Sequence, residues 1–212
     1  MNAHSPIHDT DVHRLEIVET SDRLAAVEEQ WTQLWHATDA HIFQSHGWIS
    51  AWWKTLSDRE GFALRIGLAW KDEKLVGVVP LAITRRKGLR WLEWAAGAYS
   101  DYGDILRAPE CPDLVLDGLW TRICDAGGFD LALINRLLPD AAAWRIFAPG
   151  KTFAPNKAGR VRLRPNHRQE ISSRIGGDWE SGAAWLAGHP KKTRQNYRRG
   201  VRLLEEAGTT GV

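Results

Sequence analysis

The stretch FALRIGLAWKDEKLVGVVPLAIT, residues 62–84, decides the fold. Two apolar runs, Phe62 to Trp70 and Leu75 to Thr84, flank the polar residues 71–74. Runs of this length on either side of a short polar turn are typical of paired antiparallel strands. We therefore predict a β-hairpin, and the rest of the chain is assigned outward from it.

Upstream of the hairpin, the sequence predicts one strand and two helices. Residues 12–19 alternate as a short strand does, and Ser21 can cap a helix whose apolar residues run at helical spacing to Trp35. A second helix is expected from Gly47 to Leu56, with Trp48 and Trp52 along one side. These two helices fill the connection between the first strand and the hairpin.

Downstream, strands and helices follow each other in a mixed order. The expected segments are an extended stretch at 89–95 that resumes at 102–106, a helix at 112–124, a strand at 129–134, a helix at 140–147, and two final strands at 161–164 and 169–173. The order is not a simple βαβ alternation. It predicts an α/β domain of the α+β type, with a mixed central sheet flanked by helices.

Charge divides the chain into unlike regions. Residues 1–150 contain 15 Lys and Arg against 21 Asp and Glu, whereas residues 151–212 contain 13 against 5. Gly176 and Gly177 are typical of a linker, and Pro190 introduces a basic helix. We predict a disordered tail at 1–11, a domain at 12–174, and the incomplete start of a second domain at 178–212.

Composition excludes several classes of protein. The chain is 43% hydrophobic and 25% charged, which is typical of a folded domain. Its 2 cysteines are too few for a disulfide framework and have no metal-binding spacing. The N-terminus lacks the basic start and apolar run of a secretory signal, and no apolar stretch approaches the ~20 residues that span a bilayer. We expect a cytoplasmic protein without a transmembrane segment.

Four stretches in order resemble one family. FQSHGWISAWW (43–53), LVGVVPL (75–81), SDYGD (100–104), and KKTRQNYRR (191–199) followed by LLEEAG (203–208) are similar to segments of CelD-like proteins. That group, named for cellulose biosynthesis, belongs to the GNAT acyltransferase superfamily. The resemblance spans about residues 12–208 and implies a GNAT-like first domain joined to the first helix of a second, acetyltransferase-type domain.

The resemblance implies acyl transfer to an amine or hydroxyl of a sugar or polysaccharide-related acceptor. The co-substrate would be acetyl-coenzyme A, bound mainly by a C-terminal domain beyond Val212. Related Fem-type tandem proteins use aminoacyl-tRNA instead, so the donor stays open. Proteins that resemble this one usually continue well past the basic helix, and we expect this chain alone to be inactive.

The connection at residues 107–113 departs from the family pattern. A GNAT domain grips the polyanion with a glycine-rich loop between its fourth strand and the next helix, where backbone N–H groups face the phosphates. Here that connection reads RAPECPD. Two prolines remove N–H donors, and two acidic residues repel phosphate. The first domain is expected to bind coenzyme A poorly.

The SDYGD turn holds the candidate catalytic residues Asp101, Asp104 and Tyr102. A carboxylate near the acceptor could act as a general base. The alternative is a turn in which an aspartate accepts backbone hydrogen bonds.

The candidate substrate-binding residues are Trp48, Trp52, Ser100, Arg194 and Arg198. The tryptophans could stack on sugar rings, although tryptophan at helical spacing is more often part of a core. We interpret His41 and His46, on either side of the aromatic helix, as structural histidines. No metal site emerges from the sequence.

The basic helix leaves a second function open. Lys191, Arg194, Arg198 and Arg202 fall near one helical face, which could contact an anionic partner or simply lie in water. The chain could then be a non-catalytic adaptor that presents this helix to a partner. No docking motif for specific DNA binding is present, and the oligomeric state cannot be inferred.

Overall fold

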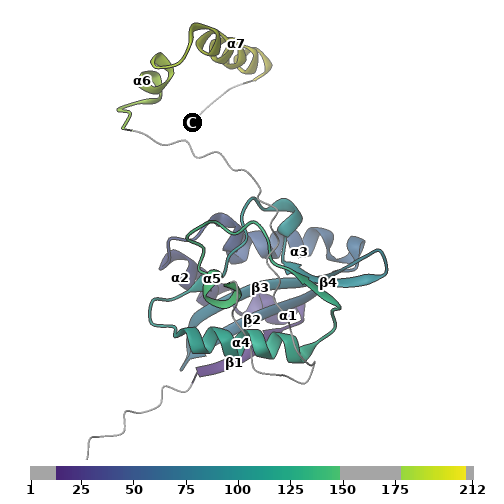
Figure 1. Cartoon of the computed structure of the whole chain (residues 1–212). Coiled ribbons are helices and arrows are strands. Elements are labelled where there is room, and N and C mark those ends of the chain that lie inside the picture. The colour runs from purple at the N-terminus through teal and green to yellow at the C-terminus, as the bar shows by residue number, and fades with distance from the viewer. Residues whose placement is uncertain (1–12, 149–177, 209–212) are drawn as a thin grey trace, which may run out of the picture. The chain divides into compact units, whose positions relative to one another are not determined.

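The computed structural model describes residues 13–148 and 178–208, whose path Figure 1 shows. The chain divides into two compact units, Met1–Arg168 and Gln169–Val212. The domain predicted from the sequence ends a few residues later, at residue 174. The expected strands at 161–164 and 169–173 and the linker glycines lie outside the described residues, and each unit is treated separately below.

The first unit is built on a mixed sheet of strands in the order β1-β2-β3-β4-β6, with β5 beside β3. The strands are β1 (His13–Val18), β2 (Ala63–Lys71), β3 (Lys74–Arg86), β4 (Leu89–Trp94), β5 (Leu106–Arg107) and β6 (Leu131–Leu133). The hairpin prediction is confirmed, because β2 and β3 pair antiparallel from Ala63↔Ile83 to Lys71↔Lys74. Residues 64–70 and 75–84 are all buried, so the sheet is covered on both faces, which explains continuous apolar runs in place of alternation.

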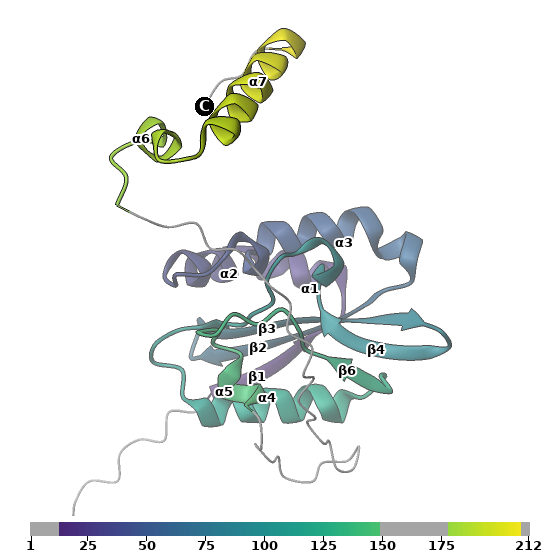
Figure 2. The same ribbon diagram turned by 45° about the horizontal axis from the view of Figure 1, so that its top comes forward.

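Helices cover both faces of this sheet, and the α+β fold expected from the sequence is observed. The helices of the first unit are α1 (Ser21–Ala26), α2 (Glu28–His36), α3 (His46–Glu60), α4 (Asp113–Ala126) and α5 (Trp144–Phe147), with 3-10 turns η1 (Ile42–Gln44) and η2 (Gly97–Tyr99). Figure 2 shows α1, α2 and α3 on one side of the sheet and α4 and α5 on the other. The α4 side chain of Leu119 sits directly over Gly67 of β2, where a Cβ would lie only 2.9 Å from it.

The first predicted helix is two helices. The chain breaks at Val27, whose φ of −102° and ψ of 7° end α1 and begin α2. The cap is Thr20 rather than Ser21, because the Thr20 hydroxyl accepts a hydrogen bond from the Arg23 N–H. Val27 is fully buried and fits the apolar period, so the sequence contains no signal for the break.

The extended stretch after the hairpin is interrupted. Both β4 and β5 pair antiparallel with β3, at residues 81–86 and 77–78 respectively. Residues 95–105 leave the sheet between them. The chain then crosses over through α4 and returns as β6, which pairs parallel with β4. This is the one parallel pair among the strands of the described residues.

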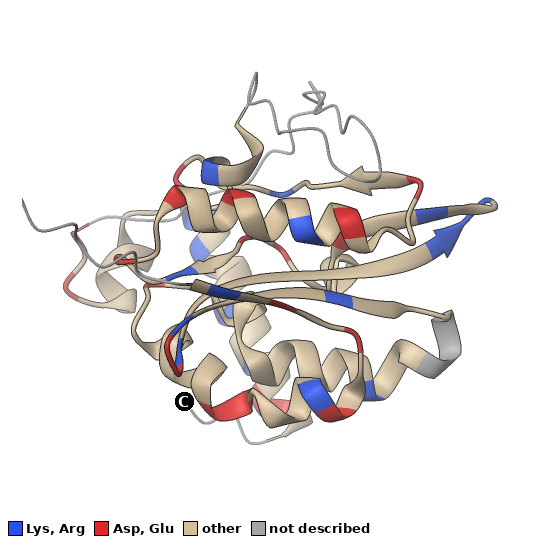
Figure 3. Ribbon diagram, turned by 90° about the horizontal axis from the view of Figure 1, so that it is seen from below, with Lys and Arg blue, Asp and Glu red and all other residues tan. Residues whose placement is uncertain are grey.

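Charges of both signs are interspersed over the first unit. Figure 3 shows Lys and Arg alternating with Asp and Glu along the helices, while basic residues gather at the tip of the β3–β4 hairpin. At that tip, Arg85, Arg86 and Lys87 are exposed. One turn is too small a surface to follow a nucleic-acid backbone, which requires several phosphate contacts.

The second unit contains two helices, α6 (Gly182–Ala187) and α7 (Lys191–Ala207). The Ser181 hydroxyl caps α6 by accepting the Ala184 N–H. None of the side chains at 178–208 is buried. Across both described parts of the chain, every helix is too short or too polar to cross a membrane.

Candidate functional site

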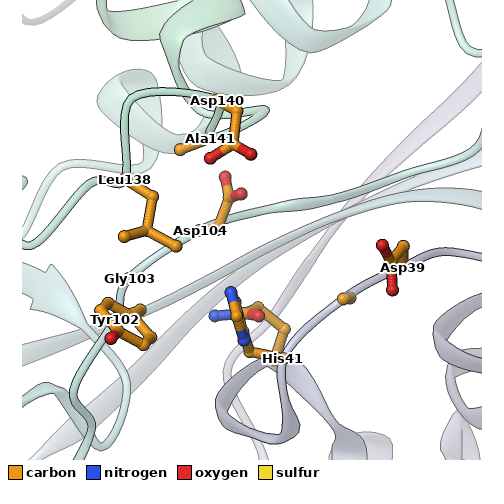
Figure 4. A pocket seen from close by; sticks show the side chains of 10 residues that line it. Asp39, His41, Tyr102, Gly103, Asp104, Leu138, Asp140 and Ala141 are labelled. Carbon is orange, nitrogen blue, oxygen red and sulfur yellow. The ribbon is translucent and has the colours of Figure 1, made fainter. Parts of the chain in front are cut away.

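A cavity of about 100 Å³ lies at the carboxyl ends of the two parallel strands, β4 and β6. Figure 4 shows it from close by. Its lining comes from three separate segments: Asp39, Ala40, His41 and Gln44 before α3; Tyr102, Gly103 and Asp104 after β4; and Leu138, Asp140 and Ala141 after β6.

Topology explains why a cavity forms here. β4 and β6 run side by side only from Trp91↔Leu131 to Glu93↔Leu133, after which both chains leave the sheet. Loops that follow neighbouring parallel strands emerge at the same sheet edge, and ligands bind in the resulting crevice. The segment at 39–44 closes the crevice from the α1–α3 side.

The loop from Ser100 to Asp104 is held rigidly beside the cavity. The buried Ser100 hydroxyl donates to the Ala96 carbonyl (2.9 Å) and accepts the Trp48 indole N–H (3.0 Å). The Arg136 guanidinium donates to the carbonyls of Gly97 (2.7 Å) and Ser100. The structure therefore brings two predicted residues, Trp48 and Ser100, into direct contact.

Gly103 allows this loop to pack closely on β4. A Cβ at this position would lie 2.1 Å from Nε1 of Trp94, much closer than any real contact. The Gly103 N–H donates to the Arg136 carbonyl (3.1 Å), and the Trp94 indole N–H donates to the Asn135 carbonyl (2.9 Å). The loops after β4 and β6 are thereby joined across the crevice.

Asp104 uses its carboxylate to organise the start of α5. Its oxygens accept the backbone N–H groups of Ala143 (2.7 Å), Ile105 (2.8 Å) and Ala142 (3.0 Å). Burial raises the pKa of Asp104 above its ordinary value, and the three backbone hydrogen bonds and the nearby His41 oppose that rise. The structure gives this aspartate the backbone-binding arrangement expected of a turn while leaving it on the cavity wall.

His41 and Tyr102 form the aromatic part of the lining. Their ring centroids are 5.0 Å apart, and Phe43 lies 6.2 Å from Tyr102. His41 is exposed, so it differs from a buried structural histidine, whereas His46 is buried and bonds the Leu24 carbonyl through Nε2 (2.8 Å). His41 and Tyr102, like the carboxylates of this lining, are of residue types that can exchange a proton with a bound molecule.

Sequence reasoning missed four polar residues of this lining as site residues: Asp39, His41, Gln44 and Asp140. Asp39, His41 and Asp140 belong to no motif, and Gln44 lies in the FQSHGWISAWW stretch but was not predicted as a site residue. They become neighbours only because η1 and the loops after β4 and β6 converge in space.

The other predicted residues lie elsewhere. Asp101 is exposed and does not line the cavity, and Trp52 is buried in the core, packed against Phe62 and Trp53. In the second unit, Arg194 donates to the carbonyls of His189 (2.7 Å) and Ala187 (3.2 Å), so it closes the end of α6. Arg198 is exposed on α7.

The connection at 107–113 is occupied by its own side chains. Arg107 donates to the Cys111 carbonyl (2.9 Å) and pairs with Asp113 (3.4 Å) in the first turn of α4. Glu110 pairs with Lys74 (2.6 Å). A carboxylate already lies where the start of a helix would attract a phosphate.

Neither cysteine suits nucleophilic chemistry. Both are buried and free, and burial raises the pKa of Cys111 to about 11 and of Cys124 to about 12. A thiol with such a pKa stays protonated at neutral pH, and the thiolate is the nucleophile. Within residues 13–148 and 178–208, no three His, Cys, Asp or Glu side chains gather as metal ligands do.

A second cavity, of about 370 Å³, opens between α2, the β2–β3 turn and the loop after β5. Its lining combines glutamines and apolar groups with the Lys74–Glu110 pair: Gln30, Gln33, Leu34, Ala37, Glu73, Lys74, Leu75, Ala108, Pro109 and Glu110. It contains no histidine, tyrosine or unpaired cation that would indicate a reaction.

No family model, curated protein or solved structure matches this chain. The sheet topology and the cavity at the ends of β4 and β6 are therefore the basis for any functional assignment.

Proposed function

We propose that this chain carries the non-coenzyme-binding part of an acyltransferase. The enzyme would move an acyl group from acyl-coenzyme A to an amine or hydroxyl of a sugar or polysaccharide-related acceptor. The observation that carries the proposal is the topology: antiparallel pairing in the order β1-β2-β3-β4, a crossover through α4, and a parallel return to β6. This order of elements agrees with that implied by the resemblance to CelD-like proteins.

The blocked connection supports the assignment of coenzyme binding to another part of the enzyme. Arg107 pairs with Asp113 and donates to the Cys111 carbonyl, and Pro109 and Pro112 offer no N–H group. A pyrophosphate placed there would meet the Glu110 and Asp113 carboxylates in place of free amides.

The cavity supports a role in holding the acceptor. Acyl transfer needs a group that removes a proton from the attacking amine or hydroxyl. In the proposed enzyme the exposed imidazole of His41 would take that role, and its ring contact with Tyr102 on the cavity wall supports this. Asp104 would act as a positioning residue, because its oxygens are engaged with the backbone at Ala142 and Ala143.

Calorimetry with acetyl-coenzyme A tests the first half of the proposal. We expect no saturable binding to the 212-residue chain at low micromolar concentrations. A low micromolar or tighter dissociation constant would contradict it.

The second half is tested on the longest product of the gene that encodes this chain. That product should release free thiol from acetyl-coenzyme A in the presence of an amino-sugar acceptor. His41→Asn should lower kcat/KM, whereas the exposed, off-cavity control Asp101→Asn should not. A product without thiol release would refute the acyltransferase assignment.

One observation favours the adaptor function. Arg198, Arg199 and Arg202 are exposed on α7, with Tyr197 and Leu204 exposed as well. If α7 binds an anionic partner, that binding should weaken steeply with added salt, because ions screen exposed charges. Arg198→Gln tests whether α7 binds such a partner, since Arg194 and not Arg198 makes the hydrogen bonds at the end of α6.

A further inference from the structure

We propose that the cavity beside Tyr102 binds a primary ammonium group. Its polar lining includes three carboxylates, Asp39, Asp104 and Asp140, and the residues that line it include no Lys or Arg. An ammonium group has three N–H donors and no acceptor, so it is complementary to such a lining.

The buried side chain of Gln44 distinguishes this cavity from an ordinary acidic surface. Its side chain lines the cavity, and the residue is only 2% exposed. Its backbone is held on both sides, since its N–H donates to the His41 carbonyl (3.1 Å) and its carbonyl accepts the Trp31 indole N–H (2.8 Å). Within the described residues, no hydrogen bond satisfies the Gln44 side-chain amide. Buried polar groups are normally hydrogen-bonded, so an amide that lines a cavity without a protein partner among the described residues is available to a ligand.

Two carboxylates on the opposite wall, Asp104 and Asp140, would attract a cation. Figure 4 shows the Asp104 and Asp140 carboxylates turned toward each other, with the His41 ring across the cavity from them. Burial raises the pKa of Asp104, against its three backbone hydrogen bonds and the nearby His41. A bound cation would favour the ionised form of Asp104 and so offset the effect of burial.

The size and geometry of the cavity favour an organic ammonium over a metal ion. A volume of about 100 Å³ equals the space of about three water molecules, enough for the ammonium and one or two carbons. In the described part of the chain, His, Cys, Asp and Glu side chains do not converge as a metal site requires. The Tyr102 ring adds an aromatic surface, which attracts cations. The rest of the ligand would extend into solvent.

Taking the ammonium to be the acceptor of acyl transfer rests on the proposed function, whereas the binding itself does not. On that basis the acceptor would be an amine, such as an amino sugar, rather than a hydroxyl.

Nuclear magnetic resonance on the isotope-labelled full chain tests the proposal, with glucosamine at a pH where it is protonated and N-acetylglucosamine as its neutral counterpart. Ethylammonium and ethanol form a second matched pair. We expect saturable shifts of the Gln44 and Gly103 amide signals with the two cations and not with the neutral compounds. Equal shifts with the neutral compounds, or none at these amides, would overturn it.

Three variants make the test specific. Asp140→Asn and Gln44→Leu should each weaken ammonium binding by about three- to tenfold, the range expected for losing one partly exposed hydrogen bond to a charge. Asp101→Asn changes an exposed carboxylate in the same loop that does not line the cavity, so it should leave binding unchanged. An equal loss of binding in Asp140→Asn and Asp101→Asn would show nonspecific charge attraction and refute the site. The amide spectrum of each variant reports whether it is folded.

Failure of this inference differs from failure of the proposed function. Ammonium binding in a gene product without acyl transfer would leave the site standing and refute the acyltransferase. Acyl transfer by a gene product whose cavity does not bind ammonium would refute the site and leave the acyltransferase assignment standing.

Discussion

Two residues of the loop after β4 determine the shape of the cavity. Gly103 lets the chain pass against the Trp94 indole, and Asp104 ties the loop to the start of α5 through three backbone N–H groups. A tight contact and a buried carboxylate are both sensitive to small chemical changes. Substitutions at these positions therefore test the local geometry directly.

Gly103→Ala is expected to destabilise the first unit. The new methyl group would meet the Trp94 indole at 2.1 Å, so either the loop or the ring must move. Overpacking of this kind costs about 1–3 kcal/mol of unfolding free energy. Denaturant unfolding measures the change, and Gly47→Ala serves as control, since a Cβ there meets nothing within 4 Å. An unchanged midpoint for Gly103→Ala would show that the loop packs differently.

Asp104→Asn is expected to change how stability depends on pH. The pKa of Asp104 is raised from its ordinary value of 3.8, chiefly by burial, so the folded chain holds that proton more tightly than the unfolded chain. Its stabilising contribution is fully present below pH 3.8 and is lost as the pH rises through the folded-state pKa. The wild-type chain should thus lose stability relative to Asp104→Asn as the pH rises.

Thermal unfolding of both proteins across that pH range provides the measurement. Asp101→Asn should run parallel to the wild type, since its side chain is exposed. A wild-type chain that instead gains stability over Asp104→Asn with rising pH would mean that the hydrogen bonds outweigh burial.

At the scale of elements, the short parallel pair β4–β6 is the critical contact, because the cavity lies at its end. An ion pair fixes the start of the β4–β6 pairing. The Asp130 carboxylate accepts hydrogen bonds from the Arg90 backbone N–H (2.8 Å) and from the Arg90 guanidinium (2.8 Å). The Asp130 N–H in turn donates to the Arg90 carbonyl (2.9 Å). Because β6 is only three residues long, the Arg90–Asp130 interaction is a large part of what fixes the register of β6 on β4.

Removal of the Arg90–Asp130 interaction should change the stability of the first unit in acid. Hydrogen bonding from Arg90 lowers the pKa of Asp130 from 3.8 to about 2. Its stabilising effect is present above pH 3.8 and is lost as the pH falls through about 2. Asp130→Asn should therefore lose less stability than the wild type over that interval, as measured by thermal unfolding.

Arg90→Gln should have the same effect, and the double variant should add little, because both changes remove one interaction. Additive effects of the two changes would show that the residues act separately.

Local patterns predicted the elements better than the site. The hairpin could be predicted because its two apolar runs and polar turn are contiguous in sequence, and α3 because Trp48 and Trp52 recur at helical spacing. The cavity could not, because residues 39–44, 102–104 and 138–141 are separated by long stretches and meet only through the β4–β6 pairing. Asp104 was named as a candidate from the SDYGD turn, whereas Gln44, although it lies in the FQSHGWISAWW stretch, carries no sign in the sequence that it would line a cavity.

At the scale of the whole molecule, the two units differ in what stabilises them. The first contains one core in which Trp31, Leu68 and Trp120 are at most 1% exposed. In the second, no described side chain is buried, and α7 is held by Arg194 and its own backbone hydrogen bonds. Isolated helices of this length are marginal in water, because nucleation is costly and packing supplies most helix stability.

Heating should therefore reveal two different transitions in one chain. Ten of the 12 tryptophans lie in the first unit and contribute to the near-ultraviolet signal. We therefore expect this signal to change in one cooperative step. Part of the far-ultraviolet helical signal should decline gradually from lower temperature, as α7 frays. Gly200→Ala identifies this part, since a Cβ at Gly200 meets nothing within 4 Å and alanine favours the interior of a helix by about 1 kcal/mol. The variant should raise the helical signal at low temperature and shift its gradual decline upward, while the near-ultraviolet midpoint stays fixed. If the midpoint moves with the substitution, or if the wild-type signals coincide at all temperatures, the helix and the core unfold as one cooperative system.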